Sequence, residues 1–349
     1  MSSQAKSPLA VHGGEPVRGA DQQWPVWPVY DDAERRALMD VLESRKWFYN
    51  DRVAQFEKEF AAFQDARFCI LCSSGTAALE VMLEVLGIGA DDEVLIPPYT
   101  FVATMSAVMR VGATPVFVDV DASWCMDPWQ IEAAVTPRTK AIMPVHFGGR
   151  ICDMDRLHEI GAKHDIPVLE DACHSWGAKW EEKGTGALGR AGVFSFQASK
   201  NITCGEGGAI LTDDEDLADM CRSIVNCGRD KKGPWYHHVN VGTNARLSEF
   251  GAAMLSAQLT RLEEQTLRRG RNATILNAEL AEIEGLIPQP GSNRITRRAY
   301  HVYCLRIEPD RFGCSRERFV EAAKAEGLNI SASYPVPLYE QPVYKKQPG

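Results

Sequence analysis

Short apolar runs alternate with helical patterns along the middle of the chain. The run FCILCS at 68–73 is followed by apolar residues from Ala78 to Leu86 at the spacing of one helix face. Further strands are predicted at 93–97, 114–120, 140–147, 167–173, 192–196 and 208–212, and helices at 100–111, 128–135, 154–164 and 214–225. Parallel neighbours need a crossover, so this alternation predicts a mostly parallel, seven-stranded α/β sheet covered on both faces, from about residue 50 to 240.

The alternation ends after this core. A polar loop at 228–249 leads into a long helical pattern at about 248–283, followed by a strand at 301–308 and a helix at 315–326. This predicts a smaller α+β lobe, which we expect the N-terminal stretch with its WPVWP segment to join. We therefore divide the chain into residues 1–245, the N-terminal segment and large domain, and residues 246–349, a small C-terminal domain.

Composition narrows the class of protein. The chain has 349 residues and a net charge of −9, which disfavours binding to nucleic acid through neutralised phosphates. Ten cysteines are too dilute for a disulfide framework and predict buried thiols in a reducing compartment. We find neither a leader peptide at the N-terminus nor a run of apolar residues long enough to span a membrane. We expect a cytoplasmic protein that does not bind membranes.

In an open α/β sheet, ligands bind at the carboxyl ends of the strands, so residues that directly follow a predicted strand are candidates for binding or catalysis. After the first strand comes SSGTAAL at 73–79, where Ser74, Gly75 and Thr76 precede a helix. The N–H groups and hydroxyls of such a turn can bind a phosphate. The same residues could equally form a helix cap and a tight turn.

Two further strand ends carry ionisable residues. Asp171 ends an apolar strand in LEDACHSWGA, where a carboxylate serves either as a structural cap or as a ligand for a positive group, and His174 follows it. Ser195 and Lys200 lie between two apolar strands in VFSFQASKNITCGEGGAIL. Together, a phosphate-binding helix start, a strand-end Asp and a loop Lys match the needs of pyridoxal phosphate (PLP), whose phosphate, ring nitrogen and aldehyde they would bind.

The chain resembles the DegT/DnrJ/EryC1/StrS family of sugar aminotransferases. The resemblance runs from GGEPVR at 13–18 to YPVPLYEQP at 334–342 and includes SGTAAL, PPYTF, LEDACHSWGA, FSFQASKNITCGEGG and GTNARLSE. It implies the aspartate-aminotransferase-like fold of PLP enzymes, fold type I.

The resemblance also implies roles for individual residues. Lys200 would form the Schiff base with the cofactor and move the proton during transfer, and Asp171 would pair with the ring nitrogen. His174 would lie beside the ring near its hydroxyl, and Phe101 would stack on it.

Four more positions match residues that bind the cofactor phosphate. Gly75, Thr76 and Ser195 match phosphate-binding positions within the subunit. Asn244 matches an asparagine that reaches the phosphate of the neighbouring subunit. The resemblance therefore implies a homodimer with shared active sites.

The reaction that the resemblance implies has two halves. L-Glutamate or L-glutamine donates its amino group to the cofactor, and the pyridoxamine form then aminates a keto-sugar, typically nucleotide-linked, or a keto-cyclitol. Two departures stand out. The chain ends soon after residue 342 where family members usually continue, so we expect a minimal or shortened small lobe, and Cys227 stands where some relatives have histidine.

The sequence bears on three alternative functions. A PLP-dependent sugar dehydratase carries histidine in place of the lysine, which Lys200 argues against. A nicotinamide-dependent oxidoreductase lacks support because no GxGxxG follows a predicted strand. A cofactor-binding sensor or idle subunit stays open.

Two sets of residues have no clear assignment. A metal site at Cys69 and Cys72, or at His237 and His238, is less favoured than buried thiols and loop histidines because no further ligands complete it. Several loop residues either line the acceptor cleft or only pack: Trp47, Tyr236, His237, His238 and Tyr334.

Overall fold

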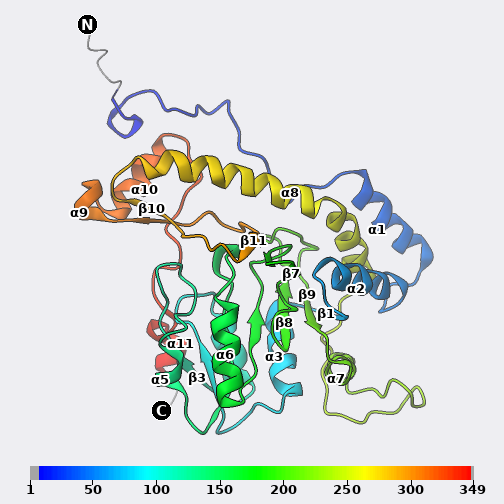
Figure 1. The fold of residues 1–349 in the computed structure, drawn as a ribbon. Coiled ribbons are helices and arrows are strands. Elements are labelled where there is room, and N and C mark those ends of the chain that lie inside the picture. Colours follow the sequence, from blue (N-terminus) through cyan, green and yellow to red (C-terminus); the bar gives the residue numbers. More distant parts are fainter. Residues whose placement is uncertain (1–7, 347–349) are drawn as a thin grey trace, which may run out of the picture.

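The computed structural model describes residues 8–346 (Figure 1). Residues 1–7, part of the stretch where we expected no leader peptide, and residues 347–349 lie outside the described residues. Within the described range, no helix combines the length and apolar character needed to cross a membrane. The longer helices are α1 (Asp32–Ser44), α2 (Asp51–Phe63), α3 (Gly75–Val85), α4 (Ala103–Arg110), α6 (Met154–His164), α7 (Glu215–Val225), α8 (Glu249–Ala281) and α10 (Arg316–Ala325). The short ones are η1 (Ala10–His12), α5 (Ile131–Ala134), η2 (Phe147–Gly149), α9 (Pro309–Phe312), η3 (Leu338–Glu340) and α11 (Pro342–Lys345).

Seven strands form the central sheet in the order β3, β2, β4, β5, β8, β9, β1. Their bounds are β1 (Phe68–Cys72), β2 (Glu93–Ile96), β3 (Thr114–Phe117), β4 (Thr139–Ile142), β5 (Leu169–Asp171), β8 (Ala191–Ser195) and β9 (Gly208–Thr212). Two parallel bridges, Ile142 to Val168 and Val145 to Asp171, join the three-stranded part to the four-stranded part. Only β9 runs antiparallel to its neighbours, β8 and β1. The mostly parallel, seven-stranded sheet predicted from the sequence is confirmed.

Alternating side chains of the strands pack against two helical layers. In β1, Ile70 and Cys72 join a core cluster with residues of α3, α4 and α7, whereas Cys69 and Leu71 join a second cluster with residues of α2 and α8. Successive strand residues point to opposite faces, so an apolar run such as FCILC is buried on both. The result is a helix, sheet and helix sandwich.

The smaller strands depart from the prediction. The strand predicted at 301–308 is shorter, β12 (Leu305–Ile307), and pairs antiparallel with β10 (Leu286–Pro288). Three short strands were not predicted: β6 (Lys179–Trp180), β7 (Lys183–Gly184) and β11 (Ile295–Arg297). β11 pairs with β6 of the large domain rather than with β10 or β12. Strands of two or three residues show no periodicity that a sequence pattern could reveal.

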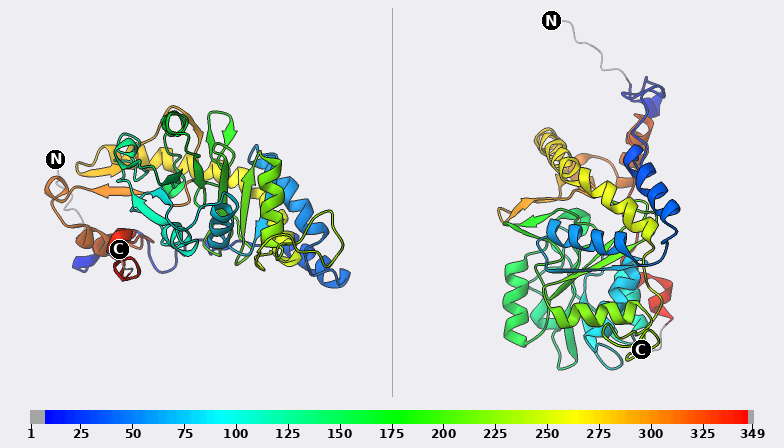
Figure 2. Two further views of the ribbon diagram at one scale, coloured as in Figure 1. Left: turned by 90° about the horizontal axis from the view of Figure 1, so that it is seen from below. Right: turned by 90° about the vertical axis from the view of Figure 1, so that its right-hand side faces the viewer.

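The N-terminal stretch packs against α10. The Glu326 carboxylate accepts hydrogen bonds from the N–H groups of Ala10 at 2.8 Å and Val17 at 2.9 Å, and Trp24 Nε1 donates to the Gly327 carbonyl at 2.9 Å. Figure 2 shows this stretch beside the α10 region in both views. A domain boundary at residue 245 stays a prediction.

Glu249 joins α8 to α2. Its buried carboxylate accepts hydrogen bonds from the N–H groups of Asn50 at 2.7 Å, Arg52 at 2.8 Å and Val53 at 3.0 Å. These N–H groups lie at the start of α2, where Asn50 makes no capping bond with its own side chain. A carboxylate from a distant helix thus caps α2 and also complements its dipole.

Glu249→Ala is expected to lower the free energy of unfolding by about 2–4 kcal/mol, because three buried or part-buried N–H groups lose a charged acceptor. Urea denaturation followed by circular dichroism measures this. Glu264→Ala, on the exposed side of the same helix, is the matched control and should change stability by less than about 0.5 kcal/mol. Equal stability of the two variants would contradict the capping role.

Candidate active site

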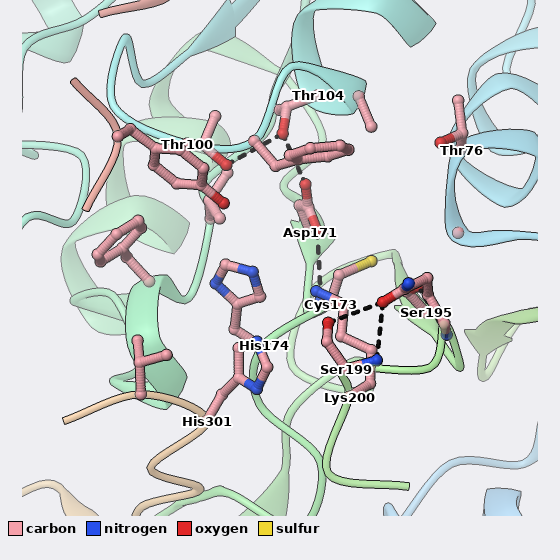
Figure 3. Close-up of a pocket in the computed structure, with 18 of the residues that line it drawn as sticks. Thr76, Thr100, Thr104, Asp171, Cys173, His174, Ser195, Ser199, Lys200 and His301 are labelled. Atoms are coloured by element: carbon pink, nitrogen blue, oxygen red, sulfur yellow. Dashed lines mark hydrogen bonds between the residues drawn. The ribbon is translucent and has the colours of Figure 1, made fainter. Parts of the chain in front are cut away.

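A cavity of about 690 Å³ opens at the carboxyl ends of the strands (Figure 3). Segments that follow β1, β2, β5 and β8 contribute to its walls. Two later segments, at 301–302 and 332–335, also line it. Seven of the eight site residues predicted from the sequence line it: Gly75, Thr76, Phe101, Asp171, His174, Ser195 and Lys200.

The start of α3 forms one wall of the cavity. Ser74 caps the helix, since its side chain accepts a hydrogen bond from Ala77 N at 3.0 Å. A Cβ atom at Gly75 would lie 2.8 Å from Ser195 Cβ, so only glycine fits between α3 and the end of β8. The helix start, Thr76 and Ser195 therefore place N–H groups and hydroxyls at one end of the cavity, an arrangement suited to an anion.

Asp171 ends β5 and is 4% exposed. Its carboxylate accepts hydrogen bonds from Thr104 Oγ1 at 2.8 Å and from Cys173 N at 3.2 Å. Thr104 lies in the first turn of α4 and is 3.3 Å from the hydroxyl of Thr100. These two donors leave the carboxylate with oxygen lone pairs free to accept from one more positive or N–H group.

The neighbouring Glu170 anchors the same strand on its other side. Its buried carboxylate accepts hydrogen bonds from the N–H groups of Gly186, Leu188 and Gly189, each at 2.7 Å, and lies 2.9 Å from His146 Nε2. Cys152 N donates to His146 Nδ1 at 3.3 Å. This network fixes the loop after β7 against the strand that carries Asp171.

Lys200 is half-buried in the turn after β8, where its N–H donates to the Gln197 carbonyl at 2.9 Å. Its Nζ lies 5.6 Å from the ring centroid of Trp176, a completely buried residue. Burial lowers the pKa of Lys200, and the nearby Cys173 and Asp171 oppose this in part. The amine is therefore more readily deprotonated than that of an exposed lysine.

His174 is buried beside Lys200 and is 6% exposed. Burial, together with the charge of Lys200, lowers the pKa of His174 well below its usual range, so its imidazole is neutral at physiological pH. Its Nδ1 is enclosed and has no hydrogen-bond partner in residues 8–346. A buried polar atom without a partner is costly, which indicates that a ligand completes the site.

The remaining residues singled out from the sequence differ in where they lie. Phe101 lines the cavity with 54% of its surface exposed, but Asn244 lies on the surface and is not part of the cavity wall. Tyr334 is the one acceptor-cleft candidate that lines the cavity, whereas four candidates are exposed outside it: Trp47, Tyr236, His237 and His238. Cys227 also lies outside, with Sγ 3.3 Å from Arg246 Nη1.

The cysteines and histidines considered as metal ligands lie in a buried strand and in an exposed loop. Cys69 and Cys72 are buried within β1, and burial raises the pKa of both thiols well above their usual range. His237 Nδ1 lies 3.3 Å from a carboxylate oxygen of Asp230. In residues 8–346 no group of three or more His, Cys, Asp or Glu side chains could hold a metal ion.

Several residues of the site were not identified from the sequence. Thr104 was expected only as part of a helix, and His301, which lines the cavity, only as the start of a strand. Asn201, next to Lys200, was given no role. The one available signal was position, because Thr100 and Thr104 closely follow a predicted strand at 93–97.

Comparison with known proteins gives a consistent result. The sequence model of the DegT/DnrJ/EryC1/StrS aminotransferase family matches residues 28–349. The 3-amino-5-hydroxybenzoate synthase of Amycolatopsis mediterranei (strain S699) is 42% identical over 308 residues, 86% of this chain and 79% of that protein. The L-glutamine:2-deoxy-scyllo-inosose aminotransferase of Micromonospora echinospora is 41% identical over 357 residues, which cover 97% of this chain and 84% of that protein.

The fold is also similar to that of solved structures. The crystal structure of 3-amino-5-hydroxybenzoic acid (AHBA) synthase matches 93% of this chain and 85% of its own, with a TM-score of 0.88 and 39% identity. The family resemblance and the fold type I predicted from the sequence are thereby confirmed. The chain belongs to the DegT/DnrJ/EryC1/StrS aminotransferase family, which depends on pyridoxal phosphate.

Proposed function

We propose that this chain moves an amino group from L-glutamine or L-glutamate to a keto-cyclitol or a keto-sugar. The observation that carries the proposal is the grouping, in one cavity, of a half-buried lysine amine, a buried carboxylate with two donors and a neutral histidine with an unpartnered nitrogen. The relative from Micromonospora echinospora, named for L-glutamine and a keto-cyclitol, supports this donor and this class of acceptor. The amine of Lys200 favours an aminotransferase over a dehydratase, which carries histidine at this position.

The residues of the cavity fit pyridoxal phosphate. Gly75, Thr76 and Ser195 would hold its phosphate at the start of α3. His174 Nδ1, enclosed and without a partner in residues 8–346, would hydrogen-bond to the ring hydroxyl. When bound, the cofactor withdraws electrons from the substrate carbon that carries the amino group, which makes its C–H bond acidic.

The chain's own side chains then hold and move protons. Asp171, oriented by hydrogen bonds from Thr104 Oγ1 and Cys173 N, would hold a proton at the ring nitrogen. Lys200, whose pKa is lowered by burial, would take the proton from the substrate carbon and return it. Phe101, on the cavity wall, would cover one face of the ring.

We also propose a homodimer in which Asn244 completes the partner's site. Asn244 is exposed and outside its own cavity. Two loops, at 46–50 and 228–244, are connected through Arg246, which follows the second loop and whose guanidinium lies 4.8 Å from the ring centroid of Phe48. They expose large apolar side chains, namely Trp47, Phe48, Trp235, Tyr236 and Val241. Such apolar surface marks protein interfaces, which supports a second copy of the chain as the partner.

A cytoplasmic location, expected from the sequence, is likewise a proposal. All ten cysteines are free thiols, and five of them are buried. Free thiols in this number are typical of a reducing compartment, where disulfides do not persist.

Lys200→Ala is expected to lower kcat by at least about 10³-fold, because no other lysine among residues 8–346 lines the cavity and could take the proton. Absorbance spectra of PLP-loaded protein, with L-glutamine and L-glutamate added separately, test both donors. The wild type should show a visible band that one donor bleaches. Lys183→Ala, which removes a surface lysine paired with Asp213, should behave as the wild type. Substantial transamination by Lys200→Ala would refute the assignment.

The reactivity of Lys200 should depend on pH with a midpoint below that of free lysine. Because burial lowers the pKa of Lys200, the neutral amine accumulates as the pH rises through this lowered value. The rate of PLP loading by the apoprotein, followed from pH 6 to 11, should therefore rise with pH and then level off. The pH at the midpoint of this rise should lie below that of an exposed lysine. A midpoint at or above about 10.4 would show that burial has no such effect.

Mixing two inactive variants tests the shared site. Asn244→Ala and Lys200→Ala should each be inactive alone, because each site would need Lys200 from one chain and Asn244 from its partner. In a mixed dimer, one of the two sites carries both natural residues. Co-refolded variants should thus recover roughly a quarter of wild-type activity, given random pairing and one intact site per mixed dimer. No recovery, with a dimer present by light scattering, would contradict the shared site.

A further inference from the structure

The residue that follows Lys200 links two distant segments of the chain. Asn201 is buried, and its Nδ2 donates to the Ala299 carbonyl at 3.1 Å. Its Oδ1 lies 3.2 Å from Nδ1 of His301. One side-chain amide therefore connects the turn that carries Lys200 with the segment 299–301.

This amide determines which nitrogen of His301 carries the proton. The Ala299 carbonyl can only accept, so the amide nitrogen faces it and the amide oxygen faces His301. That oxygen also can only accept, so Nδ1 of His301 must be the donor. Burial and the charge of Lys200 lower the pKa of His301 to about 3, so the ring is neutral and its Nε2 is left as an acceptor.

The position of His301 is also held by its surroundings. Its ring centroid lies 4.8 Å from that of His174 and 5.4 Å from that of the buried Trp176. Tyr300 has a φ of +45°, a left-handed conformation that is unfavourable for a residue with a Cβ atom. Ala299 N donates to the Gly149 carbonyl at 3.2 Å, which helps to keep this segment in place. Strained backbone persists where the surrounding contacts determine it, and it is common at functional sites.

His301 lines the cavity and is half-buried. Its Nε2 makes no hydrogen bond within residues 8–346, yet unlike Nδ1 of His174 it is not an enclosed atom. A neutral imidazole nitrogen with a free lone pair accepts from a hydroxyl or an N–H group but has nothing to donate to a carboxylate. This part of the cavity is thus suited to a hydroxyl-bearing ligand.

We propose that Asn201 is a positioning residue that fixes His301 in its Nδ1–H form, so that His301 Nε2 accepts a hydrogen bond from a hydroxyl group of the keto acceptor. This inference rests on the proposed function, because the acceptor is the hydroxyl-bearing substrate. It adds a specific contact for the acceptor.

The tautomer can be measured without turnover. In apoprotein labelled with ¹⁵N-histidine, His301→Gln identifies the signals of His301. The wild type should show Nδ1 protonated and Nε2 not, and Asn201→Ala should populate the Nε2–H form because it removes the oxygen that accepts from Nδ1. An unchanged tautomer in Asn201→Ala would overturn the positioning role.

Kinetics with L-glutamine and 2-deoxy-scyllo-inosose test the contact with the acceptor. Asn201→Ala should raise the KM for 2-deoxy-scyllo-inosose by about tenfold, the effect of one lost hydrogen bond, while the KM for L-glutamine stays unchanged. Asn277→Ala is the matched control, since it removes an asparagine that accepts from Tyr303 outside the cavity.

The outcomes separate the two proposals. A loss of kcat in Asn201→Ala with an unchanged acceptor KM would show that His301 does not contact the acceptor. Circular dichroism and the band of bound cofactor check that each variant is folded. A wild type that transaminates neither 2-deoxy-scyllo-inosose nor a keto-sugar would contradict the proposed function, whereas the tautomer measurement would still decide the role of Asn201.

Discussion

Two adjacent carboxylates at the end of β5, Glu170 and Asp171, are removed from water, and the architecture around the cavity satisfies both. Neighbouring strand residues point to opposite faces of the sheet, so each carboxylate needs its own donors. Glu170 takes three backbone N–H groups from the loop at 186–189 and contacts His146, whereas Asp171 takes the hydroxyl of Thr104 and Cys173 N. Meeting these two requirements ties β5 to the loop on one side and to α4 on the other.

The large α/β core was predictable because its strands are continuous apolar runs buried on both faces. All seven strands of the sheet begin and end within a few residues of the predicted ranges. The sequence did not reveal that β9 inserts between β8 and β1, because strand order depends on contacts between distant segments. It also did not reveal β6, β7 and β11, whose two or three residues obtain their conformation from their partners rather than from a pattern.

Within the site, the residues that sequence reasoning found are those that follow strands in recognisable motifs, such as Asp171 and Lys200. Those it missed act through a second residue from another part of the chain. Thr104 matters because it reaches Asp171, and Asn201 matters because it reaches His301. A threonine or an asparagine is common in any loop or helix, so only the folded chain distinguishes these two from the rest.

The place of β9 also has a consequence for the order in which the chain can fold. β1 ends at Cys72, yet its one partner in the sheet, β9, begins at Gly208, and the carboxylate that caps α2 comes later still, from Glu249. During synthesis on the ribosome, β1 and α2 emerge long before the residues that complete them. The apolar edge of β1 therefore stays unpaired until most of the chain has been made, a stage at which chaperones protect such edges from aggregation.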